Sequence, residues 1–288
     1  MNSSLWWSNL VASSAQIAAL AAVGVLLPWA LKVRLPRARL IYYQALLAVC
    51  LLWPATQPWR RPVLPSYRLA PVTRAGTPAP SLPTTGRGIP WQDLALMALG
   101  AGAALRAMWL SLGLWRLRRY RLESDLLYPL PQSVDDARLL VGADADVFLS
   151  GVVAGPVTFG FLHPVVLLPL RFRDLDYQQQ HAIACHEFLH IRRRDWLVTV
   201  CEEAVGALLW FHPAIWWLLS RIRLTREQVV DREVVQLTRS GQPYIDALLA
   251  MAGARPQLDL APAPLFLRRR HLSQRLRSLL KEVSMANA

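Results

Sequence analysis

The chain has 288 residues, of which 54% are apolar and 18% are charged. A typical soluble domain has about 45–50% apolar and about 25% charged residues, so this composition disfavours both a disordered chain and a simple soluble enzyme. The net charge is +13, an excess that in an apolar chain is typical of cytoplasmic segments beside membrane spans. The three cysteines have no regular spacing, so neither a disulfide framework nor a cysteine-based zinc site is predicted.

Three apolar runs predict three transmembrane helices in the first part of the chain. They cover residues 10–31, 40–59 and 94–115, and each is close to the roughly 20 residues that a bilayer requires. Arg106 interrupts the third run, and we expect its side chain to face protein or water rather than lipid. A cleaved signal peptide is disfavoured, because no basic residue precedes Lys32.

Clusters of basic residues predict the orientation of these helices. One cluster lies at residues 32–39, after the first run, and another at residues 116–121, after the third. The positive-inside rule places both in the cytoplasm and the N-terminus outside. The expected organisation is two transmembrane helices with a short basic loop (1–59), a Pro-rich external loop (60–90), a third transmembrane helix (91–116), a globular domain (117–255) and a basic amphipathic tail (256–288).

The globular domain is predicted to contain short strands followed by a long helix. Residues 147–169 have short β-branched runs separated by glycine and proline, which fits strands near a sheet edge. Asp176 and Gln179 then form a capping-box pattern that predicts the start of a helix. We expect this helix to continue without a break to residue 204.

The motif HEFLH at residues 186–190 lies within that predicted helix. His186 and His190 are four residues apart, so their imidazoles project from one face and can reach one zinc ion. Glu187 would lie beside the metal and accept a proton from its water, whose pKa zinc lowers from about 15.7 to about 7. The expected cofactor is therefore one Zn²⁺ per chain.

A catalytic zinc requires a third protein ligand, for which Glu227 is the best candidate. It lies on a later segment with helical spacing of apolar residues, and Asp231 lies on the same face, where it could accept the outer N–H of a ligating histidine. Glu202 and Glu203 are disfavoured, because in a continuous helix they would lie about 18 Å beyond His190.

Each of these assignments has an ordinary structural alternative. Two histidines with this spacing also occur on the surface of a helix without a metal. Glu227 could instead pair with Arg223, and Arg226 with Glu233, as surface ion pairs.

The uncharged run of residues 204–220 is short for a transmembrane helix and contains Pro213. If it crossed the bilayer, Glu227 would emerge on the opposite side from the two histidines. We therefore expect it to fold back as two short pieces. These would bury Trp210, Phe211 and Trp216 against the zinc helix or at the cytoplasmic interface.

The tail from residue 265 has leucines on one helical face and basic residues on the other. A helix on an anionic membrane surface and packing against the globular domain are both open, and nucleic-acid binding is a third, less favoured, alternative. The S-x-x-K pattern at Ser278–Lys281 is interpreted as a coincidence, because no K-T-G accompanies it.

Four segments together resemble the BlaR/MecR-type antirepressor membrane metallopeptidases, which are gluzincins. They are HEFLHIRRRDWL, LLWFHPAIWW, REQVVD and the preceding PVTFGFLHPVVLLP, and the resemblance covers about residues 1–285. It implies an α-helical membrane protein with an α+β zinc metallopeptidase domain after three transmembrane helices. It also implies His186, His190 and Glu227 as metal ligands and Glu187 as the base.

The resemblance further implies a signalling endopeptidase of the bacterial inner membrane with its zinc site facing the cytoplasm. The expected substrate is a protein or peptide, such as a DNA-binding repressor or the chain itself, cut between about residues 255 and 288. An edge strand formed by Val157, Thr158, Phe159 and Gly160 is expected to bind it as an extended peptide.

Several expectations concern partners and rival functions. We expect contact with the lipid bilayer and no direct binding of nucleic acid. Whether the chain forms a homo-oligomer is left open. Family members with a penicillin-binding sensor domain continue further, so β-lactam sensing is not predicted here. The chain is interpreted either as a shorter relative with another input signal or as a truncated one. The rival functions are a non-catalytic membrane transducer with a structural zinc and a CAAX-type membrane protease.

Overall fold

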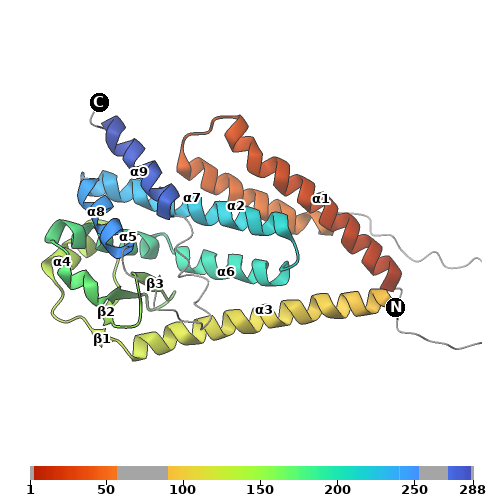
Figure 1. Ribbon diagram of the computed structural model, residues 1–288, viewed down its shortest axis with the longest axis horizontal. Coiled ribbons are helices and arrows are strands. Elements are labelled where there is room, and N and C mark those ends of the chain that lie inside the picture. Colours follow the sequence, from red (N-terminus) through yellow and green to blue (C-terminus); the bar gives the residue numbers. More distant parts are fainter. Residues whose placement is uncertain (1–2, 57–89, 240, 253–271, 287–288) are drawn as a thin grey trace, which may run out of the picture.

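A computed structural model describes residues 3–56, 90–239, 241–252 and 272–286 of the chain (Figure 1). Its first part contains three helices that are long and apolar enough to cross a membrane, as the sequence predicted. They are α1 (Ser3–Ala30), α2 (Pro36–Leu52), which continues into the short 3-10 helix η1 (Trp53–Thr56), and α3 (Trp91–Leu122). Most of the expected external loop lies outside the described residues.

A small sheet follows the third helix. Its strands are β1 (Asp125–Leu126), β2 (Asp146–Ser150), β3 (Val157–Phe159) and β4 (Val165–Pro169), in the order β1-β2-β4-β3. β2 and β4 are parallel, and the other pairs are antiparallel. β3 is therefore an edge strand, as the glycines and prolines on either side of it predicted. Gly160 ends it with a φ of +93°, and a Cβ at this position would collide with the backbone carbonyl of His163.

Both faces of the sheet are covered by helices. On one face, Val166 and Leu168 of β4 join the core built with α4 (Gln132–Val141) and α5 (Tyr177–Arg192). On the other, Val165 and Leu167 contact Leu117 of α3, so the third helix continues past residue 116 and becomes part of the globular domain. The 3-10 helix η2 (Leu170–Asp174) links β4 to α5.

The expected single helix over residues 177–204 is wrong. Its start is correct, since Asp176 and Gln179 form both bonds of the capping box. It ends at Arg192, however, and a second helix, α6 (Asp195–Leu208), follows. Arg194 adopts a left-handed conformation with a φ of +56°, which turns the chain between the two helices. No glycine, proline or asparagine marks this turn in the sequence, so the local signals for a break are missing.

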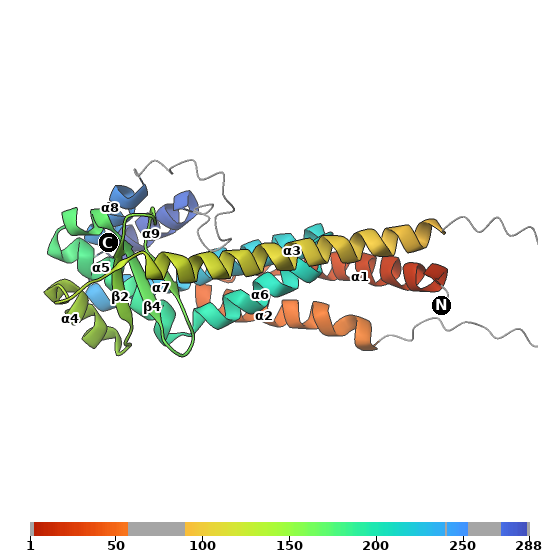
Figure 2. The ribbon, with the colours of Figure 1, turned by 90° about the horizontal axis from the view of Figure 1, so that it is seen from below.

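The uncharged run of residues 204–220 folds back, as expected, rather than forming a single helix. It contains the end of α6, a turn at residues 209–212 and the start of α7 (Pro213–Thr238), with His212 as the N-cap residue of α7. Figure 2 shows this α6–α7 hairpin running alongside the three long helices. Ile215, Leu218 and Leu219 of α7 share a buried cluster with residues of α1 and α2.

The tip of the α6–α7 hairpin contacts the membrane helices rather than the zinc helix, which corrects the expected location of its tryptophans. The indole of Trp210 donates to the carbonyl of Leu99 in α3 (3.1 Å), and His212 Nε2 lies 3.0 Å from the carbonyl of Ser14 in α1. At 1.5 Å per residue, these two carbonyls lie about 12–16 Å from the N-terminal ends of their helices. The tip therefore reaches well inside the length of the predicted spans.

The guanidinium of Arg106 lies over the ring of Trp216 at 5.0 Å, so this arginine of α3 faces protein, as expected. A Cβ at Gly102 would overlap the Trp210 indole, so the absence of a side chain there lets the hairpin approach α3. A cation on an aromatic face and a close helix approach both favour a fixed position for the hairpin.

Two further helices complete the globular domain. They are α8 (Gln242–Ala252) and α9 (Leu272–Ala286). Tyr244 and Ile245 of α8 and Leu279 of α9 belong to the same buried core as α5. Of the alternatives for the tail, packing against the domain is the one seen, because α9 lies on α7.

Candidate metal centre

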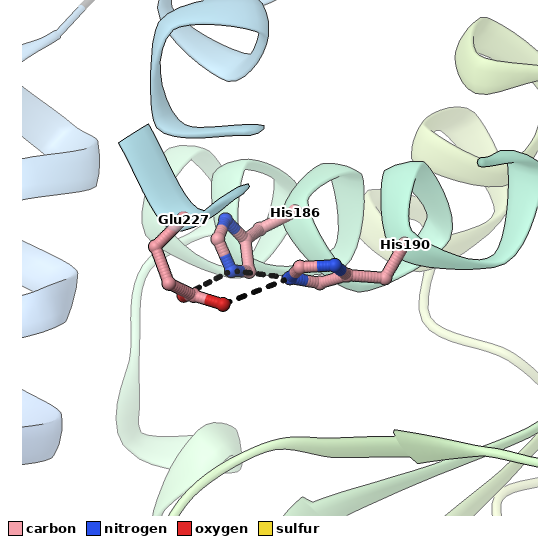
Figure 3. A group of neighbouring side chains, drawn as sticks. All are labelled: His186, His190 and Glu227. Atoms are coloured by element: carbon pink, nitrogen blue, oxygen red, sulfur yellow. Dashed lines mark hydrogen bonds and ion pairs between the residues drawn. The ribbon is translucent and has the colours of Figure 1, made fainter. Parts of the chain in front are cut away.

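Three side chains from α5 and α7 converge beside the sheet. His186 and His190 project from one face of α5, and their Nε2 atoms are 3.1 Å apart. Glu227 of α7 brings Oε2 to 3.6 Å from His186 Nε2 and Oε1 to 3.7 Å from His190 Nε2. Figure 3 shows the two imidazoles and the carboxylate directed toward one another. Among the described residues, this is a group of ligand-type side chains close enough to hold one metal ion.

The chemistry and spacing of these atoms fit a zinc ion. Zinc binds histidine nitrogen and carboxylate oxygen at about 2.0–2.2 Å, so tetrahedral ligand atoms lie about 3.4 Å apart. The three observed separations lie close to this value. Two histidines and one glutamate leave a fourth position, the arrangement typical of catalytic rather than structural sites.

His190 is held by a buried aspartate that sequence reasoning missed. Its Nδ1 lies 2.8 Å from Asp195 Oδ2 at the start of α6. This contact places the proton on Nδ1 and leaves Nε2 free to bind a metal. Burial alone would lower the pKa of His190, but the bond to Asp195 and the carboxylate of Glu227 outweigh it and raise this pKa. Since a continuous helix would have carried Asp195 onward along α5, only the turn at Arg194 brings it back.

His186 is held in a similar way, through a tyrosine. The hydroxyl of Tyr244 donates to Asp231 (2.6 Å) and lies 2.8 Å from His186 Nδ1, whose proton it accepts. Asp231 Oδ1 itself is 3.5 Å from that nitrogen. Asp231 therefore lies behind His186, as predicted, but Tyr244 makes the direct contact, and its position 58 residues later gives no sequence signal.

Glu227 is held by Arg275 of α9, with Nη1 2.9 Å from Oε2. Burial alone would raise the pKa of Glu227, but Arg275 and the two histidines hold it well below its usual value. A carboxylate kept ionised in this way is ready to bind a cation. The ion pairs considered as the alternative are wrong, because Arg223 pairs with Glu203, Arg226 with Glu202, and Glu233 with Arg192.

The two acidic residues rejected as ligands form ion pairs instead. Glu202 pairs with Arg226, and Glu203 with Arg223 at 2.6 Å. Both carboxylates are buried between α6 and α7. The reason given for rejecting them was wrong, since they lie on a separate helix, but they remain outside the metal centre.

Glu187, the residue expected to act as base, is also buried beside the two histidines. The hydroxyl of Thr158 in β3 donates to Glu187 Oε2 at 2.5 Å, which places the edge strand directly against the centre. The side chains of Val157 and Phe159 are buried in the core. Only the backbone atoms of these two residues are therefore available to a peptide. A small pocket beside His190 is lined by Thr158, Gly160, Phe161, Arg194 and Trp196, among others.

Two comparisons relate the chain to known proteins. A family model described as BlaR1 peptidase M56 matches residues 83–279. The regulatory protein BlaR1 of Bacillus licheniformis is 25% identical over 87 residues, which are 30% of this chain and 14% of the relative. Because the family model covers more than half of the chain, the protein belongs to the BlaR1 peptidase M56 family of membrane metallopeptidases and signal transducers.

Proposed function

We propose that this protein is a membrane-embedded zinc endopeptidase that acts in signalling by cutting a protein substrate. The observation that carries the proposal is the convergence of His186, His190 and Glu227 beside the buried carboxylate of Glu187. A structural zinc would not require an acid beside the ligands or an edge strand in contact with that acid. Both features are present around this centre.

Several residues of the chain have separate roles in the proposed hydrolysis of a peptide bond. When bound, zinc polarises both a water molecule and the carbonyl oxygen of a substrate. Glu187 accepts the proton of the attacking water and passes it to the leaving amine. Thr158 holds the Glu187 carboxylate in place, while the backbone of β3 aligns an extended peptide by strand addition.

The proposed substrates lie on the cytoplasmic side. The basic segments at residues 32–39 and 116–121 lie toward the globular domain, which supports a cytoplasmic centre and an external N-terminus. A cytoplasmic regulator, such as a DNA-binding repressor, and the chain itself are the proposed targets. The expected self-cleavage segment between about residues 255 and 288 falls largely outside the described residues.

A substitution of Glu187 separates this proposal from a transducer with a structural zinc. In Glu187→Gln, the amide oxygen still accepts the bond from Thr158, so folding and zinc content should be preserved. Proteolysis of a peptide library by the full chain in vesicles should fall by about 100-fold or more, since general base catalysis is lost. Glu123→Gln, an exposed change at the C-cap residue of α3, is the matched control and should retain activity. Equal cleavage by wild type and Glu187→Gln would reject the catalytic role.

A further inference from the structure

One guanidinium lies between the two carboxylates that α7 directs toward the candidate metal centre. Arg275, on α9, contacts Asp231 through Nε–Oδ2 (2.9 Å) and Nη2–Oδ1 (2.6 Å). Its remaining nitrogen, Nη1, contacts Glu227 Oε2 at 2.9 Å. The side chain is only 15% exposed, so water competes little for these contacts.

The geometry of these contacts fixes the direction of the Glu227 carboxylate. Two parallel bonds to Asp231 determine the plane of the guanidinium, as in other bidentate arginine–carboxylate pairs. Nη1 is then directed at Glu227 Oε2, while Oε1 remains turned toward His190 Nε2 at 3.7 Å. A flexible glutamate side chain is in this way held in the orientation that a metal ligand requires.

The same arginine connects Glu227 to the histidine on the other helix. Arg275 Nη2 donates to the Tyr244 hydroxyl at 3.0 Å, and this hydroxyl accepts the Nδ1 proton of His186. Two candidate ligands, from α5 and α7, are thus joined through side chains from α8 and α9.

Electrostatics gives a second reason for a cation at this place. Glu227 and Asp231 are four residues apart on α7, so their negative charges repel each other. Asp231 is almost completely buried, at 3% exposure of its side chain. Removing the guanidinium would leave a buried carboxylate without a counter-charge, and Glu227 would be free to turn away from Asp231 and the histidines.

We propose that Arg275 is a positioning residue for the metal ligand Glu227, so that the C-terminal helix α9 completes the zinc centre. This inference rests on the proposed role of Glu227 as a ligand. It adds a requirement from α9, whose Arg275 lies 48 positions after Glu227 in the sequence.

The docking of α9 has other contacts, which allow the role of the guanidinium to be tested separately. Leu279 is buried in the core of the domain, and Gln228 of α7 donates to Ser278 Oγ at 3.1 Å. Ser278→Ala removes this docking bond without changing the contacts of Arg275. Arg277→Gln removes an exposed charge from the same helix and provides the matched control for charge.

The experiment compares Arg275→Gln, Arg275→Lys, Arg277→Gln and Ser278→Ala with wild type, all as full chains in detergent or vesicles. The dissociation constant for zinc is measured by competition with a chelating dye, and the visible spectrum of the cobalt(II) form reports the ligand geometry. We expect Arg275→Gln to bind zinc about 10- to 100-fold more weakly and to change the cobalt spectrum. Arg275→Lys should have an intermediate zinc affinity, since lysine keeps the positive charge but cannot make the bidentate contact of a guanidinium. Both controls should bind zinc within about 3-fold of wild type.

Each outcome decides a different question. If wild type binds no zinc, the proposed function fails. If wild type binds zinc and Arg275→Gln binds it equally well with an unchanged cobalt spectrum, Arg275 has no positioning role and the inference alone is overturned. Equal losses in Ser278→Ala and Arg275→Gln would also overturn it, because docking of α9 would then explain the effect. If Arg275→Gln does not fold, the comparison uses Arg275→Lys instead. Zinc affinity and a cobalt spectrum equal to those of wild type would then overturn the inference.

Discussion

The two histidines of the candidate metal centre have different partners behind them. His190 contacts the carboxylate of Asp195, while His186 contacts the neutral hydroxyl of Tyr244. A carboxylate partner makes an imidazole more basic and fixes its orientation. Each candidate ligand therefore has a polar partner at Nδ1, which is a carboxylate for His190 and a hydroxyl for His186.

The residue-scale prediction is that Asp195→Asn weakens zinc binding about 10- to 100-fold at pH 8, because His190 loses the partner that orients it. The measurement is a zinc dissociation constant by dye competition. Asp144→Asn, at a side chain that is 83% exposed, is the control and should bind zinc as wild type does. Undiminished affinity in Asp195→Asn would show that the contact does not support the ligand.

The pH dependence of zinc binding follows from the raised pKa of His190. Zinc needs the neutral imidazole, and protons compete for Nε2 whenever the pH approaches the pKa of the group. Since this pKa lies above the usual 6.5, affinity should begin to fall at a higher pH on acidification than for an ordinary histidine. In the zinc-free protein, the stability gained from protonated His190 is present below pH 6.5 and lost as the pH rises through the raised value. Asp195→Asn should move both transitions to lower pH.

At the scale of the elements, the sequence predicted those features that depend on local patterns. The capping box at Asp176, the HEFLH motif on a helix, the edge position of residues 157–159 and the fold-back around Pro213 all follow from short-range rules. The break at Arg194 could not be predicted, because arginine has no preference for the left-handed conformation that it adopts there. Its position is determined by tertiary contacts, among them the bond between Asp195 and His190.

Two glycines of α3 offer a test of how the hairpin is held. Gly102 faces Trp210, while a Cβ at Gly100 would meet no heavy atom within 4 Å. Gly102→Leu should displace Trp210 from the carbonyl of Leu99 and destabilise the protein by about 1–3 kcal/mol, as overpacking does. Gly100→Leu is the matched control on the same helix. Thermal unfolding and hydrogen exchange of residues 204–220 measure the difference, and equal behaviour of the two variants would contradict the observed packing.

At the scale of the whole molecule, the candidate metal centre contains side chains from five helices and the edge strand. Sequence spacing predicted the two histidines, Glu187, Glu227 and Asp231, because motif rules connect residues within one or two helices. It could not predict Tyr244 or Arg275, since nothing in the chain relates α8 and α9 to α5 before the tertiary fold is known. The contacts of Tyr244 and Arg275 are therefore a property of the fold and not of any motif.

The α6–α7 hairpin has a consequence for how the lipid affects the protein. Its first helix, α6, begins with Asp195, which contacts His190. Its second helix, α7, continues to Glu227. The tip between them forms hydrogen bonds to α1 and α3 at positions within the length of these helices. Membrane helices tilt when the bilayer becomes thinner or thicker than their apolar length. Such a tilt would pull on the tip and shift both carboxylates relative to α5. We expect zinc affinity and proteolysis to depend on acyl-chain length in reconstituted vesicles, and Gly102→Leu, with its tip displaced, to lose this dependence.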